Sequence, residues 1–303
     1  MGGVDGTRVG FVGVGRMGTP MCRNLARADG YRVLASDIDP ARADVVEACG
    51  AAWTPVTAEA ARSADVLITM LPGAKAVAAA MVDGGLVDAL PSGAVWIDMS
   101  SNSPAAAEPI RRLADARGID VLDAPVGGGV PAAEAGTLQF FVGGDGAVLK
   151  RHRPLLEVLG DPARITHVGG HGSGYTVKLI VNLLWFGQAV ATAESLLLGL
   201  RMGVDLATLR RVLADSAAES RFIRRNLDAL FAGDYMTTFG VDRCYEELAA
   251  VTELARAHQV PFEVSEAVRR IYERAAARYG SADGELLAVR LLEEESGRWL
   301  RAE

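Results

Sequence analysis

The stretch RVGFVGVGRMG, residues 8–18, decides the fold of this chain. Its first part is a short apolar run rich in valine, which predicts a buried β-strand. The run ends in the pattern G-x-G-x-x-G at Gly13, Gly15 and Gly18, and residues 17–29 then have the apolar spacing of a helix. A strand, a glycine-rich turn and a helix in this order predict the first βαβ unit of a dinucleotide-binding domain.

Each of the three glycines has a physical role at such a turn. The first permits the tight turn, the second lets a pyrophosphate approach the backbone, and the third lets helix and strand pack closely. The helix N-terminus then favours the phosphate charge. Asp37 ends a second predicted strand, where an acid accepts hydrogen bonds from an adenosine ribose. A 2′-phosphate would meet that charge, so we predict NAD as the cofactor, although the nearby Arg42 leaves NADP open.

The chain changes character near its middle. Up to about residue 168, short β-branched runs alternate with amphipathic stretches, which predicts a parallel sheet covered by helices on both faces. From about Gly172 onward no run has the character of a strand, and helical periodicity dominates. We therefore predict an α/β chain with a doubly wound sheet in a cofactor-binding domain at 1–168 and an all-α domain at 169–303.

Composition and charge narrow the functional classes. The 303 residues are 50% hydrophobic and carry a net charge of −7, which argues against nucleic acid or an anionic membrane as the main partner. Three cysteines fit no metal-ligand spacing, so no metal is predicted. They are expected to be reduced core residues of a cytoplasmic protein: Cys22, Cys49 and Cys244.

The longest apolar run extends from Tyr175 to about Leu200. A helix that crosses a lipid bilayer would rarely hold four polar residues of the kind that interrupt this run: Lys178, Asn182, Gln188 and Glu194. We predict instead a long helix that is buried on nearly all sides, between domains or subunits.

Three further loops follow predicted strands, in LPGAKAV (71–77), DMSSNSP (98–104) and DAPVGGGVPAAEAGTLQFFVGGD (123–145). In a doubly wound sheet the carboxyl ends of the strands face the ligand crevice. Three consecutive glycines after a strand turn several backbone N–H groups towards one concavity, which suits an anion or a carbonyl oxygen. These loops are therefore predicted to complete a ligand site.

With these motifs in place, the chain resembles the β-hydroxyacid dehydrogenases, which include 3-hydroxyisobutyrate dehydrogenase, tartronate semialdehyde reductase and 6-phosphogluconate dehydrogenase. The resemblance spans essentially the whole chain and includes GSGYTVKLIVN at 172–182. It implies a Rossmann domain and an all-helical domain joined by a long interdomain helix. It also implies that this helix takes part in subunit packing, in a homodimer or a tetramer of dimers.

The resemblance also implies roles for individual residues. Lys178 is expected to be the catalytic lysine and Asn182 its partner. The substrate is expected at Ser101 and at the acid-binding loop of Gly127, Gly128 and Gly129. The cofactor is expected to contact nine residues: Gly13, Gly15, Arg16, Met17, Gly18, Asp37, Leu71, Pro72 and Ser101.

The chemistry of such an enzyme explains why a lysine is needed. Hydride transfer to an aldehyde or ketone leaves a developing alkoxide, which an ammonium group stabilises and protonates. In the oxidation direction, the neutral amine of Lys178 removes the alcohol proton. Asn182 shares its helix face at i+4 and can hold the substrate oxygen or orient the ammonium group. The predicted function is NAD(P)-dependent hydride transfer between nicotinamide and a small hydroxy compound or its aldehyde or ketone.

Two departures from the family pattern bear on the substrate. Many relatives have Ser-Gly-Gly where this chain has Gly127–Gly129, so a hydroxyl is lost. In FGVDRCYEELA (239–249), Asp242 and Glu246 stand where relatives commonly have lysines. If Glu246 faces the active site, the substrate is not a simple carboxylate but a neutral polyhydroxylated or amine-bearing compound. Alternatively, both acids form a solvated face, and an arginine supplies the displaced charge: Arg221, Arg224 or Arg243.

Two other functional classes stay open at this point. Imine reductases share the implied architecture but usually have an aspartate or tyrosine in place of the lysine, so Lys178 argues against them. A non-catalytic NAD-binding protein is the other alternative, although such relatives tend to lose the lysine that this chain keeps.

Overall fold

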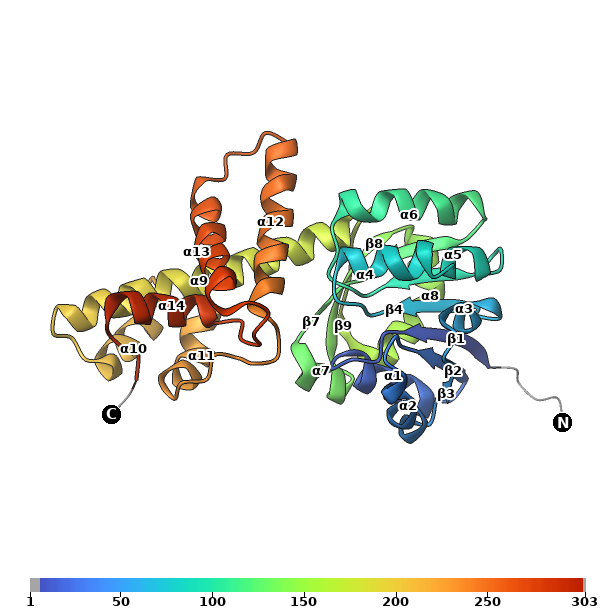
Figure 1. Ribbon diagram of the computed structural model, residues 1–303, viewed down its shortest axis with the longest axis horizontal. Coiled ribbons are helices and arrows are strands. Elements are labelled where there is room, and N and C mark those ends of the chain that lie inside the picture. The colour runs from blue at the N-terminus through green and yellow to red at the C-terminus, as the bar shows by residue number, and fades with distance from the viewer. Residues whose placement is uncertain (1–5, 302–303) are drawn as a thin grey trace. The chain divides into compact units, whose positions relative to one another are not determined.

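The computed structural model describes residues 6–301, and it divides into two compact units that meet in sequence between Lys178 and Leu179. Each unit has its own hydrophobic core. The first unit contains all the β-strands of the described residues, and the second contains only helices and their connections (Figure 1).

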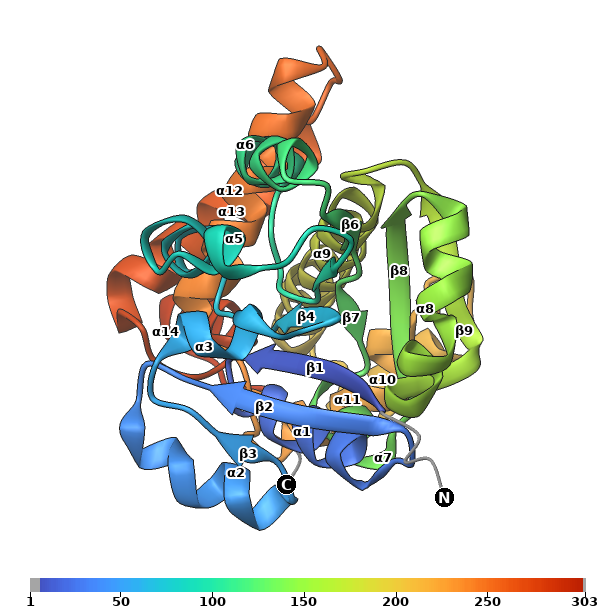
Figure 2. The same ribbon diagram turned by 90° about the vertical axis from the view of Figure 1, so that its right-hand side faces the viewer.

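The first unit is built on a doubly wound sheet (Figure 2). Six of its strands are parallel and follow the order β3-β2-β1-β4-β5-β6, which is the strand order of dinucleotide-binding domains. This confirms the predicted fold class. The strands are β1 (Thr7–Val12), β2 (Tyr31–Ser36), β3 (Ala52–Trp53), β4 (Val66–Thr69), β5 (Val95–Asp98) and β6 (Asp120–Asp123).

The far edge of the sheet is mixed, so the prediction of a wholly parallel sheet is wrong there. β8 (Leu138–Gly144) runs antiparallel to β6 and to β7 (Val126–Gly127). The connection from β7 to β8 is residues 128–137, which hold only the short helix α7 (Gly129–Ala135), whereas a parallel crossover needs a dozen or more residues. β9 (Gly160–Gly169), which was not predicted, pairs parallel with β8 after helix α8 (Gly146–Leu159).

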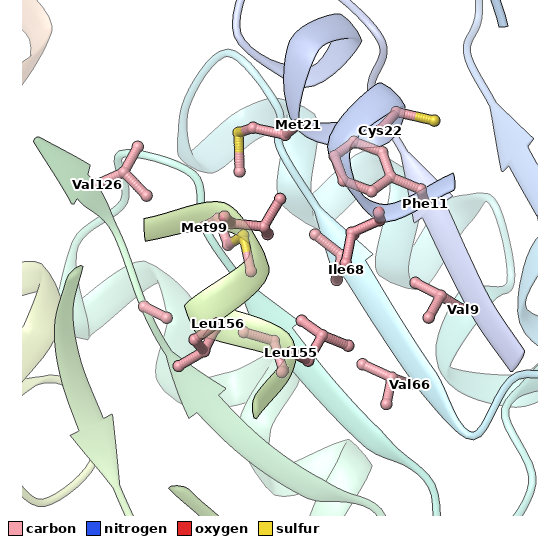
Figure 3. Close-up of a cluster of buried hydrophobic side chains, with 14 of the residues drawn as sticks. Val9, Phe11, Met21, Cys22, Val66, Ile68, Met99, Val126, Leu155 and Leu156 are labelled. Atoms are coloured by element: carbon pink, nitrogen blue, oxygen red, sulfur yellow. The ribbon is translucent and has the colours of Figure 1, made fainter. Parts of the chain in front are cut away.

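Both faces of the sheet are buried, which explains the nearly continuous apolar strands. One face packs Val9, Phe11, Val66 and Ile68 against side chains of α1 and α8 (Figure 3). The other face packs Trp96 and its neighbours against α3, α5 and α6. Besides α7 and α8, the α-helices of this unit are α1 (Gly18–Arg27), α2 (Ala43–Cys49), α3 (Thr57–Arg62), α4 (Ala74–Ala78), α5 (Leu86–Ala89) and α6 (Pro104–Ala116). A 3₁₀ turn, η1 (Pro40–Arg42), and a π-helical turn, η2 (Ala79–Asp83), complete its helical segments.

Helix α9 (Ser173–Arg201) links the two units in sequence. It is long and apolar enough to cross a membrane, a test that the core helix of a soluble protein also passes. From Leu179 onward its buried positions belong to the two cores of the second unit. Those cores also include side chains from α10 (Leu206–Ala214), α11 (Arg221–Phe231), α12 (Val241–Ala257), α13 (Glu263–Tyr279) and α14 (Leu287–Ser296).

The buried face of β4 provides a test of the first core. Ile68 is fully buried, so Ile68→Val should lower the free energy of unfolding by about 0.5–1.5 kcal/mol and Ile68→Ala by about 2–5 kcal/mol. Urea denaturation measures both. Ile38, which is 96% exposed, is the control, and Ile38→Val should leave the midpoint unchanged. Equal losses at the two positions would contradict this packing.

Candidate active site

The glycine loop between β1 and α1 gives each glycine a distinct setting. Gly13 has a left-handed φ of 100°, and its N–H donates to Ser36 O at 3.0 Å. A Cβ on Gly18 would lie 1.9 Å from Gly13 O, so helix and strand pack too closely for any side chain there. A Cβ on Gly15 would meet no atom within 4 Å. The loop is therefore tight at its first and third glycines and open at its second, which suits a pyrophosphate.

Asp37 lies directly beside this loop at the end of β2. Its Oδ2 accepts a hydrogen bond from Val14 N at 2.8 Å, and its Oδ1 accepts one from Asp39 N at 3.0 Å. These bonds fix the carboxylate where the ribose of a dinucleotide is expected. Arg42 pairs with Asp39 at 3.5 Å, Arg16 is exposed, and Met17 packs partly on the core. The residues present thus fit a nicotinamide dinucleotide.

The loop after β5 carries two neighbouring serines with different settings. Ser100 is buried, and its Oγ accepts a hydrogen bond from Leu71 N at 2.9 Å, so it holds the two loops together. Ser101 is half-buried, and its hydroxyl has no hydrogen-bond partner within residues 6–301. Pro72 is exposed in the next loop. Of the two serines, only Ser101 has its hydroxyl available to a ligand.

The carboxylate of Asp123, at the end of β6, anchors the start of α9. It is 2% exposed and accepts backbone hydrogen bonds from Gly172 N at 3.0 Å, Gly174 N at 2.8 Å and Tyr175 N at 3.3 Å. These N–H groups belong to the first turn of the helix, which has no intrahelical acceptors for them. Burial raises the pKa of Asp123, while the three N–H donors act in the opposite direction.

A second buried carboxylate completes this anchor. Asp98, at the end of β5, accepts a hydrogen bond from the Tyr175 hydroxyl at 2.7 Å and another from Thr69 Oγ1 at 2.8 Å. Burial raises the pKa of Asp98, which its hydrogen bonds partly offset, and burial also raises the pKa of Tyr175. Sequence reasoning did not single out Asp98, Asp123 or Tyr175. Their only signal was a position at a strand end or helix start.

Lys178 lies three residues beyond Tyr175 on the same helix, and so on the same side of it. It is half-buried and forms no ion pair or hydrogen bond with the described residues. The helix is fixed one turn earlier by Asp98 and Asp123, so the backbone that carries Lys178 is held against the strand ends.

The three glycines after β6 also differ from one another. Gly128 and Gly129 have left-handed φ angles of 114° and 65°, which favour glycine. Gly127 belongs to β7, and a Cβ there would make only ordinary contacts, at 3.7 Å from Gln139 and Phe141.

In the second unit, Asn182 has a partner that sequence reasoning missed. Its Nδ2 donates a short hydrogen bond to Oε2 of Glu247, which is buried on α12. The spacing of the buried residues Cys244, Leu248 and Val251 places Glu247 on the inner face of that helix, which was the available signal. Glu246 is exposed and pairs with Arg243 at 3.0 Å, so it lies on the other side of α12.

Comparison with known families accounts for both units. Residues 8–169 match the NAD binding domain of 6-phosphogluconate dehydrogenase. Residues 172–292 match the NAD-binding domain of NADP-dependent 3-hydroxyisobutyrate dehydrogenase. The chain belongs to the β-hydroxyacid dehydrogenase family. This confirms the resemblance inferred from the glycine loop, the strand-end loops and the Lys178 region.

Individual members of the family agree with this assignment. The chain is 32% identical to 2-(hydroxymethyl)glutarate dehydrogenase of Eubacterium barkeri over 96% of each chain. The solved structure of Mycobacterium tuberculosis 3-hydroxyisobutyrate dehydrogenase with L-serine superposes with a TM-score of 0.85 at 30% identity, covering 94% of this chain and 99% of that one. An imine reductase variant from Myxococcus stipitatus shares the fold, with 18% identity and a TM-score of 0.63, covering 95% of this chain and 99% of that one.

As a β-hydroxyacid dehydrogenase, the protein is an oxidoreductase that uses NAD(P) and acts on CH–OH groups. Within residues 6–301, no group of three or more His, Cys, Asp or Glu side chains could hold a metal ion.

The open second glycine and the crowded third one predict opposite results. Gly15→Ala should leave the free energy of unfolding unchanged but weaken NAD binding, because its methyl group enters the space that a pyrophosphate needs. Gly18→Ala should destabilise the protein by at least about 1–3 kcal/mol, because its Cβ overlaps Gly13 O.

Titration calorimetry with NAD and urea denaturation separate the two effects. Gly170→Ala is the matched control, because a Cβ at this exposed glycine also meets nothing within 4 Å. Equal NAD affinity in wild type and Gly15→Ala would rule out this placement of the cofactor.

The Tyr175–Asp98 hydrogen bond predicts a pH-dependent stability effect. Tyr175→Phe should cost about 1–3 kcal/mol at neutral pH, because a buried carboxylate loses a donor. Burial raises the folded pKa of Asp98 above its unfolded value. The stability that Asp98 contributes is therefore greatest at low pH and is lost as the pH rises through the folded pKa. Because the tyrosine bond favours the ionised form, the cost of Tyr175→Phe should shrink in mild acid.

Urea denaturation at neutral and mildly acidic pH measures this dependence. Tyr31→Phe is the control, because the Tyr31 hydroxyl forms no hydrogen bond with the described residues. A cost for Tyr175→Phe that is the same at both pH values would show that Asp98 does not change its ionisation state between them, which would contradict this prediction.

Proposed function

We propose that this protein is an NAD-preferring dehydrogenase or reductase of a small hydroxy compound, with Lys178 as the general acid and base. The observation that carries the proposal is the state of Lys178. Its ammonium group has no partner within residues 6–301, although the preceding helical turn is pinned by two buried carboxylates to the ends of β5 and β6. A fixed and uncommitted proton donor at strand ends suits catalysis better than structure.

The chain's own residues then have the following roles. When bound, the cofactor supplies hydride exchange with the carbon of the CH–OH group. The ammonium group of Lys178 donates its proton to the oxygen that gains charge during reduction, and the neutral amine accepts the alcohol proton during oxidation. The free hydroxyl of Ser101 hydrogen-bonds the substrate beside the nicotinamide. The backbone of Gly127, Gly128 and Gly129 receives the acid group.

The preference for NAD rests on Asp37. Its carboxylate is held by two backbone N–H groups, so it has little freedom to move away from a 2′-phosphate. Arg42 is engaged with Asp39, which reduces its availability to a phosphate. NADP is the alternative cofactor, so each assay measures turnover with NAD and with NADP.

Asn182 is proposed to act with Lys178 on the substrate oxygen. Its Nδ2 is committed to Glu247, so its Oδ1 is the atom that remains for a ligand or for the ammonium group. A substrate role for Glu246 requires it to leave Arg243. The relatives are named for 2-(hydroxymethyl)glutarate and 3-hydroxyisobutyrate, and one of them is solved with L-serine, which supports a small hydroxy acid, with or without an amine, over a neutral substrate.

The proposal extends to organisation and location. Residues 1–168 form the cofactor-binding domain, and residues 169–303 form the helical substrate and dimerisation domain. Exposed apolar side chains on α9 support self-association as a dimer or a tetramer of dimers: Ile180, Val181, Leu184 and Leu198. The negative net charge and the three free cysteines support a cytoplasmic location without nucleic acid or membrane as a partner.

Lys178 also separates this function from its alternatives. Reduction of an imine by relatives with an aspartate or tyrosine at this position does not account for an uncommitted lysine. A non-catalytic NAD-binding protein has no use for one. Turnover of a CH–OH compound that depends on Lys178 excludes both.

Lys178→Met should lower kcat by roughly 10²- to 10⁴-fold, the usual loss when a general acid or base is removed. NADH binding should be unchanged, because the glycine loop and Asp37 are untouched. The assay follows NAD(P)H absorbance with acidic, neutral and amino-bearing hydroxy compounds, with NAD and NADP in parallel.

Lys150→Met is the matched control, because Lys150 is an exposed lysine on α8, and it should retain wild-type turnover. Wild-type rates in Lys178→Met would remove Lys178 from the mechanism, and an inert wild type across the whole panel would favour a binding protein.

A further inference from the structure

Gly127 is a glycine that its backbone does not require. Unlike Gly128 and Gly129, it does not have a left-handed φ. A Cβ on Gly127 would meet nothing nearer than 3.7 Å, whereas a Cβ on Gly128 would lie 2.6 Å from the Cβ of Ala132. The fold would accept a side chain at Gly127, so its absence leaves space that a ligand can use.

That space opens onto Gln139, the cross-strand partner of Gly127 in β8. Gln139 Oε1 lies 3.7 Å from the Cβ position on Gly127 and accepts a hydrogen bond from Arg164 Nη2 at 2.7 Å. The guanidinium group therefore lies no further from the Cβ position of Gly127 than the sum of these two distances. A cation thus stands beside the acid-binding loop.

Arg164 is half-buried on β9, and its guanidinium group is not neutralised by a carboxylate of the described residues. Within residues 6–301, no carboxylate lies within ion-pair distance of it, and Gln139 is its one hydrogen-bond partner. By contrast, Arg153 on the neighbouring helix α8 is paired with Glu157 at 2.8 Å. A guanidinium group has five N–H donors in a planar fork that matches a carboxylate. Arg164 can hold Gln139 with one of them and an anion with others.

The same face of β8 carries the start of α9. Leu138 and Phe140 pack into the core, so Gln139 and Phe141 point to the opposite face. Gly143 has the same alternation as Gln139 and Phe141, and its Cβ position lies 2.4 Å from Asp123 Oδ2, which accepts the hydrogen bond from Gly174 N at the start of α9. The Arg164–Gln139 pair therefore shares a face of the sheet with the helix turn that leads to Lys178.

We propose that Arg164, oriented by Gln139, binds the acidic group of the substrate beside Gly127. This inference rests on the proposed function and assigns the substrate to the carboxylates, as a small hydroxy acid. Arg164 replaces the positive charge that relatives commonly carry on the later helix, where this chain has Glu246. Two of the three arginines first considered for that charge are already paired, Arg243 with Glu246 and Arg224 with Glu219, and the third, Arg221, is exposed on α11.

The test compares a short β-hydroxy acid with its neutral amide as substrates of the full-length enzyme. Arg164→Gln should raise KM for the acid on the order of 10- to 100-fold, because a charged hydrogen-bonding partner is lost. kcat for the acid and both constants for the amide should stay near wild type. Arg164→Lys keeps the charge but loses the fork, so it should raise KM for the acid by a smaller factor. Gln139→Ala should also raise KM for the acid by a smaller factor than Arg164→Gln, because the guanidinium group loses the hydrogen bond that orients it.

Arg62→Gln is the control, because Arg62 is an exposed arginine of the same unit paired with Glu59, and it should leave all constants unchanged. Thermal unfolding and NADH binding establish that each variant is folded. If Arg164→Gln does not fold, the acid-to-amide ratio of Arg164→Lys decides.

The outcomes separate the two proposals. A wild type that turns over neither compound with NAD or NADP overturns both. A wild type that is active, with an acid-to-amide ratio that Arg164→Gln leaves unchanged, overturns the assignment of Arg164 and leaves Lys178 in place.

Discussion

The carboxylate of Asp123 is the constraint on which the rest of the site depends. It ends β6 and accepts hydrogen bonds from three backbone N–H groups at the start of α9. A helix N-terminus needs such acceptors, and a buried carboxylate needs such donors, so each satisfies the other. On the neighbouring strand β5, the buried carboxylate of Asp98 also accepts a hydrogen bond from α9, in this case from the Tyr175 hydroxyl. Lys178 therefore follows a helix turn whose position is set by the sheet.

Local chemistry explains which parts of this arrangement the sequence could predict. The settings of Gly13, Gly15 and Gly18 follow from a turn between one strand and one helix, so a short motif specifies them. The Asp98–Tyr175 bond joins residues 77 positions apart, and only the sheet order brings them together. The strand β8 is evident in the sequence, but its antiparallel direction escaped prediction, because an apolar strand has the same composition in either direction.

The acid that the family pattern singles out on α12, Glu246, is the immediate neighbour of the acid that contacts Asn182, Glu247. Glu246 and Glu247 are adjacent in sequence but point in directions about 100° apart around the helix, so one is exposed and the other is buried. Glu246 pairs with Arg243 at the surface, and Glu247 is buried against Asn182. The family pattern predicts the altered charge at Glu246, while helical periodicity determines that Glu247 is the acid that meets Asn182. Glu247 Oε1 is buried without a partner in the described residues, so this carboxylate retains capacity for another donor.

The glycines of the first unit differ in what a side chain at each position would contact. Some lie where the fold has no room for a side chain, and others lie beside space that a ligand can occupy. Gly18 and Gly174 lie against backbone oxygens, at 1.9 Å and 2.5 Å from the Cβ position, so elements of the fold approach one another there. Gly15 and Gly127 face no such barrier, yet both stand at strand ends beside polar groups, Asp37 for the first and Arg164 for the second. A glycine that the backbone does not demand weakens a strand or loop through its entropy, so its presence there is better explained by an approaching ligand. The open space at these two glycines supports the proposal that the cofactor phosphates bind at Gly15 and the substrate acid at Gly127.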